Sequence, residues 1–434
     1  MSGQVSQGEF PPGPEQITGA SGLSEDQEAY AVQISTQARE LARGCAQVIP
    51  ESGLEHKLLT AWREGRPLRV KLGIDPSGSD LTLGHAVVLR KLRQFQDYGH
   101  VAVLIVGDFT GQIGDPTGRT RTRNVLTTEQ TRRNAETYME QAHKILLQDR
   151  LELHYNSRWL DGKSLADVLT TSRSLTVARL LERDDFARRY RENLPITLME
   201  FMYPMLQGMD SVAIDADIEL GGTDQTYNNL VGRTLQKDAG KDTQIVMTLP
   251  LLRGTDGADK MGKSLGNWIS LNDTPDDQYG KIMSLSDPIL PHYAELCCAW
   301  TDAQLNDFTE LVGRSPMEAK RVVARRVVEL YHGTDEAKYA EDRFDARFRR
   351  KELPAHLPEF AVPPAAQPVD IVDVLLAAEL VTSKGEARRL LASGGIRLDG
   401  DKLSADSGPF DHEALAGRVL QRGKLRAVRL VSGR

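Results

Sequence analysis

The sequence predicts an α/β fold whose core is a doubly wound parallel sheet, and this prediction depends on three observations. Leu68 to Ile74 is a short, mostly apolar run, typical of a strand that is buried on both faces. A turn follows at Asp75–Gly78, and from Leu83 apolar residues recur roughly at helical spacing. His100 to Phe109 is a second buried strand. A strand, a helix and a strand in this order form a parallel crossover.

Thr82-Leu83-Gly84-His85 stands at the start of the predicted helix. The unpaired backbone N–H groups and the positive dipole end of a helix start form a site for anions, most often phosphate. An imidazole in the first turn, here His85, can donate a hydrogen bond to a phosphoryl oxygen. The alternative is structural: Gly84 allows close packing of the helix on the sheet, and His85 is a polar residue with its hydrogen bonds satisfied. The tetrapeptide alone does not decide between the two.

The composition is that of an ordinary globular protein. The 434 residues suit two or three domains, with 40% hydrophobic and 26% charged residues. The apolar runs are too short to cross a bilayer, and no basic segment followed by an apolar one opens the chain, so we expect neither a membrane span nor a signal peptide. Cys45, Cys297 and Cys298 form neither a disulfide framework nor a metal motif. We therefore expect a cytoplasmic protein without a protein-bound metal site.

The charge is unevenly distributed along the chain. The formal net charge is −7, yet residues 314–351 hold 11 basic and 7 acidic residues and residues 368–434 hold 11 and 9. The C-terminal part is therefore basic and the rest of the chain is acidic. This favours RNA as a partner, although a solvated surface explains the pattern nearly as well.

The composition also divides the chain into segments. We expect an N-terminal extension, disordered and then helical, over 1–50, a sheet domain over 51–285, a helical domain over 286–352, a proline-rich linker over 353–368 and a small basic α+β domain over 369–434. Further strands are predicted at 151–155, 216–220 and 248–252, and a strand with a turn at 395–400. Helices are predicted at 25–48, 127–147, 165–190, 302–350, 371–380 and 383–391.

A glycine-rich loop, residues 111–118, follows the second strand at the carboxyl end of the sheet, where open α/β sheets bind ligands. Asp115, between Gly114 and Pro116, is well placed to meet a ligand ammonium group. Alternatively, its side chain accepts a hydrogen bond from its own backbone in an Asx-turn.

Tyr203, Gln207 and Asp210 are spaced i, i+4 and i+7, so they share one face of a helix. A hydroxyl, an amide and a carboxylate on one stripe are unusual in a core but suit the wall of a polar pocket. Exposed polar residues are the alternative, which the flanking Phe201 and Met202 disfavour.

Two further stretches, residues 221–224 and 260–263, place polar side chains after predicted strands. Asp224 follows Gly221-Gly222 and could bond a ribose diol, cap a helix, or do both. Lys260 and Lys263 flank Gly262 in a loop and could close on a polyphosphate, although a solvated turn is the usual meaning of such a segment.

These motifs, in this order, resemble the bacterial tyrosyl-tRNA synthetases, which are class I synthetases with a Rossmann-type catalytic domain. The resemblance extends from about Leu54 to Arg434 and includes a C-terminal S4-like RNA-binding domain. Thr82–His85 matches the His-Ile-Gly-His signature, and the residues 260–264 match the Lys-Met-Ser-Lys-Ser loop. The stripe from Tyr203 to Asp210 and the residues 220–225 separate the tyrosine enzyme from its tryptophan relative.

The resemblance implies that the chain activates L-tyrosine with ATP and Mg²⁺ and transfers the tyrosyl group to tRNA(Tyr), as a homodimer. It places the catalytic residues at Thr82, His85, Lys260 and Lys263. It places tyrosine binding at Lys71, Asp115, Tyr203, Gln207, Asp210 and Gln225, with Asp210 on the phenol. It places ATP binding at Gly73, Asp75, Ser77, Gly84, His85, Gly222, Asp224, Lys260 and Lys263. It places RNA binding at Lys384, Arg388, Arg389 and Arg397, and the helical domain on the anticodon side.

The chain departs from the family pattern in three places. Thr82 replaces the first histidine of the signature, Gly262 replaces a serine, and Lys71 stands where the family often has a tyrosine. These departures leave room for a synthetase-derived RNA-binding protein without catalysis. Two enzymes also remain as hypotheses. The Gln207–Asp210 pair speaks against a tryptophanyl-tRNA synthetase, and the basic C-terminal domain speaks against a small-molecule nucleotidylyltransferase.

Overall fold

The computed structural model describes residues 25–76, 78–117, 127–348, 357–362, 368–423 and 426–433. The chain forms two compact units, Met1–Tyr331 and His332–Arg434. The expected disordered segment over 1–22, Ser77 and most of the expected linker lie outside the described residues. The five-segment division of the chain therefore stays a prediction.

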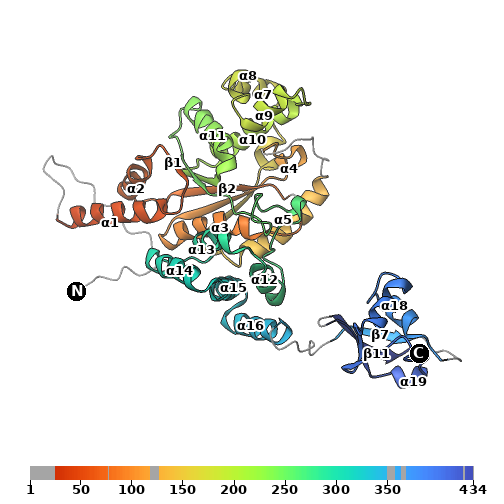
Figure 1. Cartoon of the computed structure of the whole chain (residues 1–434). Coiled ribbons are helices and arrows are strands. Elements are labelled where there is room, and N and C mark those ends of the chain that lie inside the picture. Colours follow the sequence, from red (N-terminus) through yellow and green to blue (C-terminus); the bar gives the residue numbers. More distant parts are fainter. Residues whose placement is uncertain are drawn as a thin grey trace. The chain divides into compact units, whose positions relative to one another are not determined.

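The first unit is built on a six-stranded sheet with the order β1-β6-β5-β2-β3-β4 (Figure 1). Its strands are β1 (Gln47–Ile49), β2 (Arg69–Ile74), β3 (Val101–Val106), β4 (Leu151–Tyr155), β5 (Ile218–Gly222) and β6 (Ile245–Leu249). All neighbours pair in parallel except β1, which runs antiparallel to β6 at the edge. The predicted α/β fold with a doubly wound parallel sheet is confirmed, with one antiparallel edge strand added.

The described part of the first unit also contains helices, some of which pack against the sheet. They are α1 (Glu25–Ala42), α2 (Gly53–Arg63), α3 (Leu83–Asp97), α4 (Thr110–Ile113), α5 (Thr128–Ala142), α6 (Ser157–Leu160), α7 (Leu165–Ser172), α8 (Val177–Leu180), α9 (Asp184–Arg191), α10 (Leu198–Ala213), α11 (Thr226–Asp238), α12 (Pro275–Met283), α13 (Leu290–Cys297), α14 (Asp302–Arg314) and α15 (Pro316–His332). Short 3₁₀ turns lie at η1 (Thr223–Gln225), η2 (Lys263–Leu265) and η3 (Asp287–Ile289).

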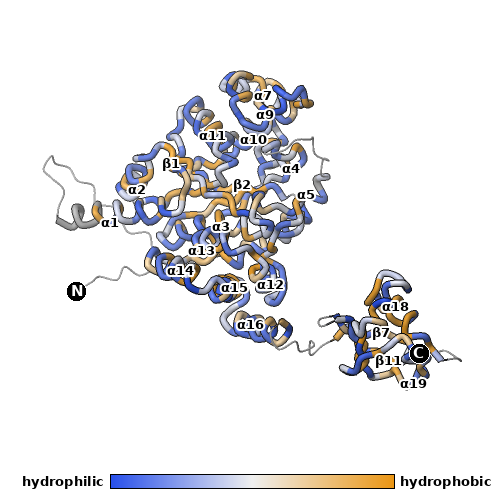
Figure 2. The backbone as a smooth tube through the Cα atoms, viewed as in Figure 1, coloured by the Kyte–Doolittle hydropathy of each residue, from blue (hydrophilic) through white to orange (hydrophobic). Residues whose placement is uncertain are grey.

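The strands at the centre of this sheet are apolar because both faces are covered. Val70, Leu72 and the residues 102–106 of β3 are buried, and Figure 2 shows hydrophobic residues concentrated along the central strands. The chain leaves β2 toward β3 on one side, while β5, the other neighbour of β2, continues to β6 on the opposite side. Their carboxyl ends therefore flank the point where the direction of winding reverses, which is where such sheets bind ligands.

Several predicted boundaries differ from the structure. The helix expected over 165–190 is three shorter helices, since Ser164 and Thr176 each cap a new start with a side-chain oxygen. The strand expected over 248–252 is shifted to β6, which ends before Pro250 because proline cannot donate to the ladder. The helix expected over 25–48 ends at Ala42, and the edge strand β1 follows.

The second unit contains α16 (Thr334–Phe348) and a five-stranded sheet with the order β7-β11-β10-β8-β9. The strands are β7 (Glu359–Val362), β8 (Ile396–Leu398), β9 (Asp401–Lys402), β10 (Val419–Arg422) and β11 (Arg426–Ser432). The helices beside them are α17 (Ile371–Ala377), α18 (Lys384–Ala392) and α19 (His412–Leu415). Their apolar faces share one core that includes Leu375, Leu391 and Leu420. The sequence predicted α17, α18 and β8 but missed β7, β9, β10 and β11.

Two features of the described residues bear on membranes and metals. None of the helices in the described ranges is long and apolar enough to cross a bilayer. Within the same ranges no group of three or more His, Cys, Asp or Glu side chains is arranged to hold a metal ion.

Candidate active site

A cavity of about 360 Å³ opens at the carboxyl ends of β2 and β5. It brings together most of the predicted site residues, from five separate stretches of the chain. Those that line it are Gly73, Asp75, Thr82, Gly84, His85, Asp115, Tyr203, Gln207, Asp210, Gly222, Asp224, Gln225 and Lys260. Ser77 lies outside the described residues. Among the described residues lining the cavity, Lys71 and Lys263 do not occur.

The first polar group in the cavity is built on two carboxylates. Tyr203 donates its hydroxyl to Asp75 Oδ2 at 2.8 Å, and Gln225 Nε2 donates to Asp115 Oδ2 at 2.7 Å. Burial, together with the neighbouring carboxylates, raises the pKa of Tyr203 well above its usual value, so its hydroxyl keeps its proton. The hydroxyl oxygen remains able to accept a hydrogen bond. Two anions with an uncharged acceptor beside them suit a ligand ammonium group.

Asp115 combines both roles that its sequence position suggested. Its Oδ1 accepts from the backbone N–H of Thr117 at 2.9 Å, which is the Asx-turn interaction. Its Oδ2 is bonded to Gln225, and Asp115 lies on the cavity wall. The turn therefore holds the carboxylate in place and does not withdraw it from the cavity.

Asp210 lies deeper, on the face of α10 that it shares with Tyr203 and Gln207, as the spacing predicted. Its carboxylate is 3% exposed and accepts from Trp159 Nε1 at 2.8 Å and from Asn156 Nδ2 at 3.3 Å. Burial raises the pKa of Asp210 to about 7, although the ammonium of Lys71 and these two hydrogen bonds oppose the rise. Near neutral pH this carboxyl group can donate or accept a hydrogen bond at the closed end of the cavity.

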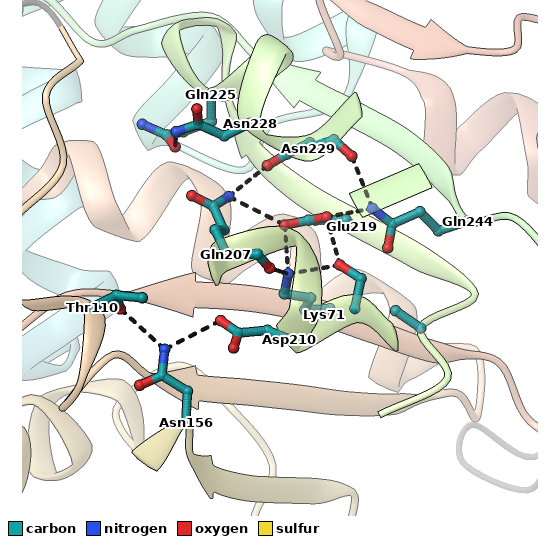
Figure 3. Close-up of polar contacts among 12 residues, drawn as sticks. Lys71, Thr110, Asn156, Gln207, Asp210, Glu219, Gln225, Asn228, Asn229 and Gln244 are labelled. Atoms are coloured by element: carbon teal, nitrogen blue, oxygen red, sulfur yellow. Dashed lines mark hydrogen bonds and ion pairs between the residues drawn. The ribbon is translucent and has the colours of Figure 1, made fainter. Parts of the chain in front are cut away.

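Asn156 and Thr110 connect the two polar groups, and neither was predicted from the sequence. Asn156 Nδ2 also donates to Thr110 Oγ1 at 3.0 Å (Figure 3). Thr110 Oγ1 in turn donates to Asp75 at 2.8 Å. Asn156 directly follows β4, so the rule that places ligand sites at the carboxyl ends of strands could have found it. Trp159, one turn further along, gave no comparable signal.

His85 is held as a neutral hydrogen-bond donor. The backbone N–H of Thr82 donates to His85 Nδ1 at 3.1 Å, so Nδ1 is unprotonated and the proton resides on Nε2. Burial, aided by the charge of Lys263, lowers the pKa of His85 to about 4. Thr82 itself is the N-cap of α3 and is 2% exposed. It therefore fixes the imidazole, in addition to lining the cavity.

The loop that carries the two lysines contributes Lys260 and Met261 to the cavity lining. Lys260 Nζ lies 2.8 Å from Asp224 Oδ2, and Lys263 Nζ donates to Tyr138 Oη at 2.9 Å. Asp224 occupies neither N-cap position, since η1 begins after Gly222 and α11 after Gln225. Tyr138, on α5, also lies beside the ring of His85, with 6.4 Å between ring centroids, and nothing in the sequence had marked it.

The three predicted glycines serve different purposes. A Cβ on Gly73 would meet no atom within 4 Å, so this backbone faces open cavity space. A Cβ on Gly84 would come no closer than 3.4 Å to Thr82 Oγ1. At Gly222, however, a Cβ would stand 2.7 Å from Leu251 and 2.8 Å from Asp224, so a larger residue would require these side chains to shift.

Lys71 is the residue whose position departs most from expectation. Its side chain is fully buried beneath the cavity, and its ammonium donates to the Gln207 carbonyl oxygen at 3.0 Å, Ser211 Oγ at 2.7 Å and Glu219 Oε1 at 2.8 Å (Figure 3). An ammonium has three protons, and all three are used. The expected direct contact between Lys71 and a substrate is corrected accordingly, because its ammonium is buried and Lys71 is not among the described residues that line the cavity.

The four predicted RNA-binding residues belong to the second unit. Lys384, Arg388 and Arg389 are exposed on α18, and Arg397 is half-buried on β8. Lys384 pairs with Asp373 at 2.5 Å and Arg397 donates to the Gly400 carbonyl at 3.0 Å.

Comparison with known proteins agrees with this geometry. The family described as tRNA synthetases class I (W and Y) matches residues 63–349. A tyrosine–tRNA ligase of Thermotoga maritima is 45% identical over 92% of this chain and 98% of its own. One from Bordetella avium is 42% identical over 94% and 99%.

Solved structures share the fold. The tyrosyl-tRNA synthetase of Archaeoglobus fulgidus, complexed with L-tyrosine, aligns with a TM-score of 0.58 at 21% identity, covering 71% of this chain and 99% of that one. A truncated mitochondrial tyrosyl-tRNA synthetase of Aspergillus nidulans aligns with a TM-score of 0.60 at 20% identity, covering 75% and 100%. The chain therefore belongs to the class I tRNA synthetases of the tryptophan and tyrosine group, in the family of the tyrosine–tRNA ligases.

Proposed function

We propose that this chain is a tyrosine–tRNA ligase that forms tyrosyl-adenylate from L-tyrosine and ATP and then charges tRNA(Tyr). The observation that carries the proposal is one cavity holding an ammonium-binding group at one wall, a buried carboxyl group at its closed end and a neutral histidine with a lysine at its mouth. The relatives named tyrosine–tRNA ligase support the same assignment.

In this proposal the tyrosine ammonium is held by Asp115, Tyr203 and Gln207, and the phenol by Asp210. Gln225, which is bonded to Asp115, lies near the substrate carboxylate. Phenylalanine is rejected because a buried Asp210 would lose its partner at the closed end of the pocket, and leaving a buried polar group unpaired costs about 1–3 kcal/mol or more.

The chemistry is a displacement at the α-phosphate of ATP. The tyrosine carboxylate oxygen forms a bond to phosphorus while the bond to pyrophosphate breaks. No side chain acts as a nucleophile, so the protein contributes positioning and charge stabilisation. A tRNA ribose hydroxyl then attacks the tyrosyl carbonyl, and AMP leaves with the electron pair of the broken bond.

We propose that one neutral hydrogen-bond donor and two cations bind the ATP phosphates. His85 donates through Nε2, and Lys260 and Lys263 supply positive charge. Asp224, which is paired with Lys260 through Oδ2, would bond the ATP ribose through its remaining acceptor capacity. Gly73 leaves space for the nucleotide, and Asp75 and Gly84 line the same cavity. Ser77 completes the set of residues that we propose for ATP binding. Mg²⁺ would arrive with the ATP phosphates and neutralise part of their charge.

We propose two macromolecular contacts for the chain, which we expect to act in the cytoplasm. The second unit binds tRNA(Tyr) through Lys384, Arg388, Arg389 and Arg397, because cations spaced along a helix and an adjoining strand suit a phosphate backbone.

A second copy of the chain is the other proposed partner. Apolar side chains are exposed on α7, α8 and α10, among them Leu165 at 74%, Val177 at 60% and Leu198 at 81%. We propose that these side chains form the homodimer interface, because large exposed apolar side chains are typical of interfaces. A homodimer on this face predicts that Leu198→Lys shifts the protein to monomer in sedimentation, and an unchanged mass would remove this face from the interface.

The departures from the family signature have local explanations that favour an active enzyme. Thr82 caps α3 and fixes His85, and the Gly262 backbone N–H donates to Asn267 Oδ1 at 2.9 Å, which holds the lysine loop. Neither change removes a cation from the phosphate region, so a catalytically inactive RNA-binding protein is disfavoured.

The test is ATP–pyrophosphate exchange with each of the twenty amino acids in the absence of tRNA. Exchange with tyrosine alone is expected. Exchange with tryptophan would mean that the pocket assignment is wrong. No exchange with any amino acid, from folded protein that binds tRNA, would overturn the catalytic function.

A further inference from the structure

The Gln207 side chain is embedded in a buried polar network that extends away from the cavity. Its Nε2 donates to Glu219 Oε1 at 3.3 Å and to Asn229 Oδ1 at 3.0 Å (Figure 3). The amide oxygen lies on the opposite side of the same group, and Gln207 is part of the cavity wall. The network therefore determines whether the oxygen or the nitrogen of the Gln207 amide faces a ligand in the cavity.

Glu219 is the centre of this network. Its Oε1 accepts from Lys71 at 2.8 Å as well as from Gln207, and its Oε2 accepts from Ser211 Oγ at 3.0 Å and from Gln244 Nε2. A carboxylate offers about four acceptor sites, and here all four are taken by donors. Glu219 is 1% exposed, so its charge depends on Lys71 for compensation.

Asn229 cannot orient Gln207 by itself. An asparagine side chain carries both an acceptor and a donor, so it can pair with either end of a neighbouring amide. Asn229 Nδ2 is buried and has no hydrogen-bond partner among the described residues, so a reversed pairing, with the Gln207 oxygen facing Asn229 Nδ2, is geometrically within reach. An ionised carboxylate only accepts, and it would repel the Gln207 oxygen. Glu219 is thus the group that excludes the reversed pairing.

We propose that Glu219, compensated by Lys71, is a positioning residue that holds the Gln207 side-chain carbonyl toward the cavity so that it accepts a hydrogen bond from the substrate ammonium. The inference rests on the proposed function, since it assumes that Gln207 meets the ammonium of tyrosine. Neither charge touches the ligand. Lys71 also bonds the Gln207 backbone carbonyl and Ser211, and so holds α10 against β2 and β5 at this level.

The test compares two ligands that differ only in the ammonium group: L-tyrosine and 3-(4-hydroxyphenyl)propanoate, its analogue without the amino group. Dissociation constants are measured by calorimetry for the wild-type chain and for Glu219→Gln. In the variant, residue 219 is neutral and can donate, so the reversed orientation of Gln207 becomes accessible. We expect the affinity for tyrosine to fall roughly tenfold, the range of one charge-assisted hydrogen bond, and the affinity for the analogue to stay within about twofold.

Glu152→Gln is the matched control. Glu152 lies on β4 of the same sheet and pairs with Arg69 at 2.6 Å, and it is not among the described residues that line the cavity. Its substitution is expected to leave both affinities unchanged. In pyrophosphate exchange, Glu219→Gln is expected to raise KM for tyrosine without changing KM for ATP.

The outcomes separate the positioning role from the proposed function. A wild-type chain that does not bind tyrosine would overturn the proposed function. A wild-type chain that binds tyrosine, with a Glu219→Gln variant that binds it equally well or loses both ligands equally, would overturn the positioning role. If Glu219→Gln does not fold because Lys71 is left unpaired, the double variant Lys71→Met with Glu219→Gln removes both charges. It is expected to show the same selective loss, and equal loss of both ligands would again overturn the role.

Discussion

The Asp210 carboxylate and the indole of Trp159 are joined by a hydrogen bond of 2.8 Å from Nε1 to Oδ1. Trp159 belongs to α6, which directly follows β4, whereas Asp210 belongs to α10. The bond therefore fixes the closed end of the cavity between two elements distant in sequence. It also occupies one acceptor site on a carboxylate oxygen. Further hydrogen bonds of Asp210 are therefore limited to directions that face the cavity.

Replacement of Asp210 by asparagine tests the phenol assignment. The substituted amide would keep the size of the side chain but would lose the charge and the freedom to exchange a proton. We expect Asp210→Asn to lower kcat/KM for tyrosine about 10–100-fold, which corresponds to about 1.5–3 kcal/mol for a hydrogen bond to a charged group. The value for phenylalanine should change much less. Unchanged selectivity in pyrophosphate exchange would remove Asp210 from phenol recognition.

The raised pKa of Asp210 also predicts a pH-dependent stability. The pKa is about 7 in the folded chain against an ordinary value of 3.8, so the folded state binds the proton more tightly. Its contribution is fully present below pH 3.8 and is lost as the pH rises through 7. Between about pH 5 and pH 8 the wild-type chain should lose about 3 kcal/mol of unfolding free energy relative to Asp210→Asn.

Urea unfolding of both proteins at the two pH values measures this difference. Lys71 and Glu219 face the same region, but they are present in both proteins, so their contribution cancels to first order. A difference between the proteins that does not change with pH would contradict the raised pKa.

We predict that Tyr138 helps to hold the loop that carries Lys260 and Lys263. Its hydroxyl accepts a hydrogen bond from Lys263, whose ammonium also lies 5.2 Å from the centroid of the ring. Tyr138→Phe removes the acceptor and keeps the cation–π contact, so we expect kcat for adenylate formation to fall about 3–10-fold, as for the loss of a hydrogen bond of about 1 kcal/mol. The dissociation constant for tyrosine should not change.

Tyr98→Phe serves as the control for that variant, because Tyr98 follows the far end of α3 and donates to Glu40 instead. Single-turnover kinetics of both variants give the comparison. Equal effects on kcat in the two would show that the Tyr138 hydroxyl has no specific part in the reaction.

We predict that a side chain at position 107 destabilises the chain at the site. A Cβ at this position would overlap Asp75 Oδ1 and Thr110 Oγ1, the two atoms that hold the Tyr203 side of the cavity. Gly107→Ala should therefore cost about 2–4 kcal/mol of unfolding free energy and raise KM for tyrosine. Gly162→Ala, where a Cβ meets no atom within 4 Å, should lie within about 0.5 kcal/mol of wild type. Equal stabilities of the two variants in chemical denaturation would contradict the crowding at Gly107.

The sequence by itself determined the doubly wound parallel sheet, the crossover from β2 to β3 and most of the cavity wall. Runs such as Leu68–Ile74 are apolar because both faces are covered, and residues after a parallel strand must meet at one edge. The helical spacing of Tyr203, Gln207 and Asp210 fixed their common face, because the number of residues per helical turn, about 3.6, is a local property.

Only the tertiary structure decided what each side chain bonds. Lys71 lies 136 and 148 positions from its partners Gln207 and Glu219, and no local pattern encodes that its ammonium turns beneath the cavity. The same reason explains why the sequence analysis missed three further residues of the site, Trp159, Asn156 and Tyr138. Hydrogen bonding depends on the direction of individual donor and acceptor atoms, and distant segments settle those directions only when they pack together.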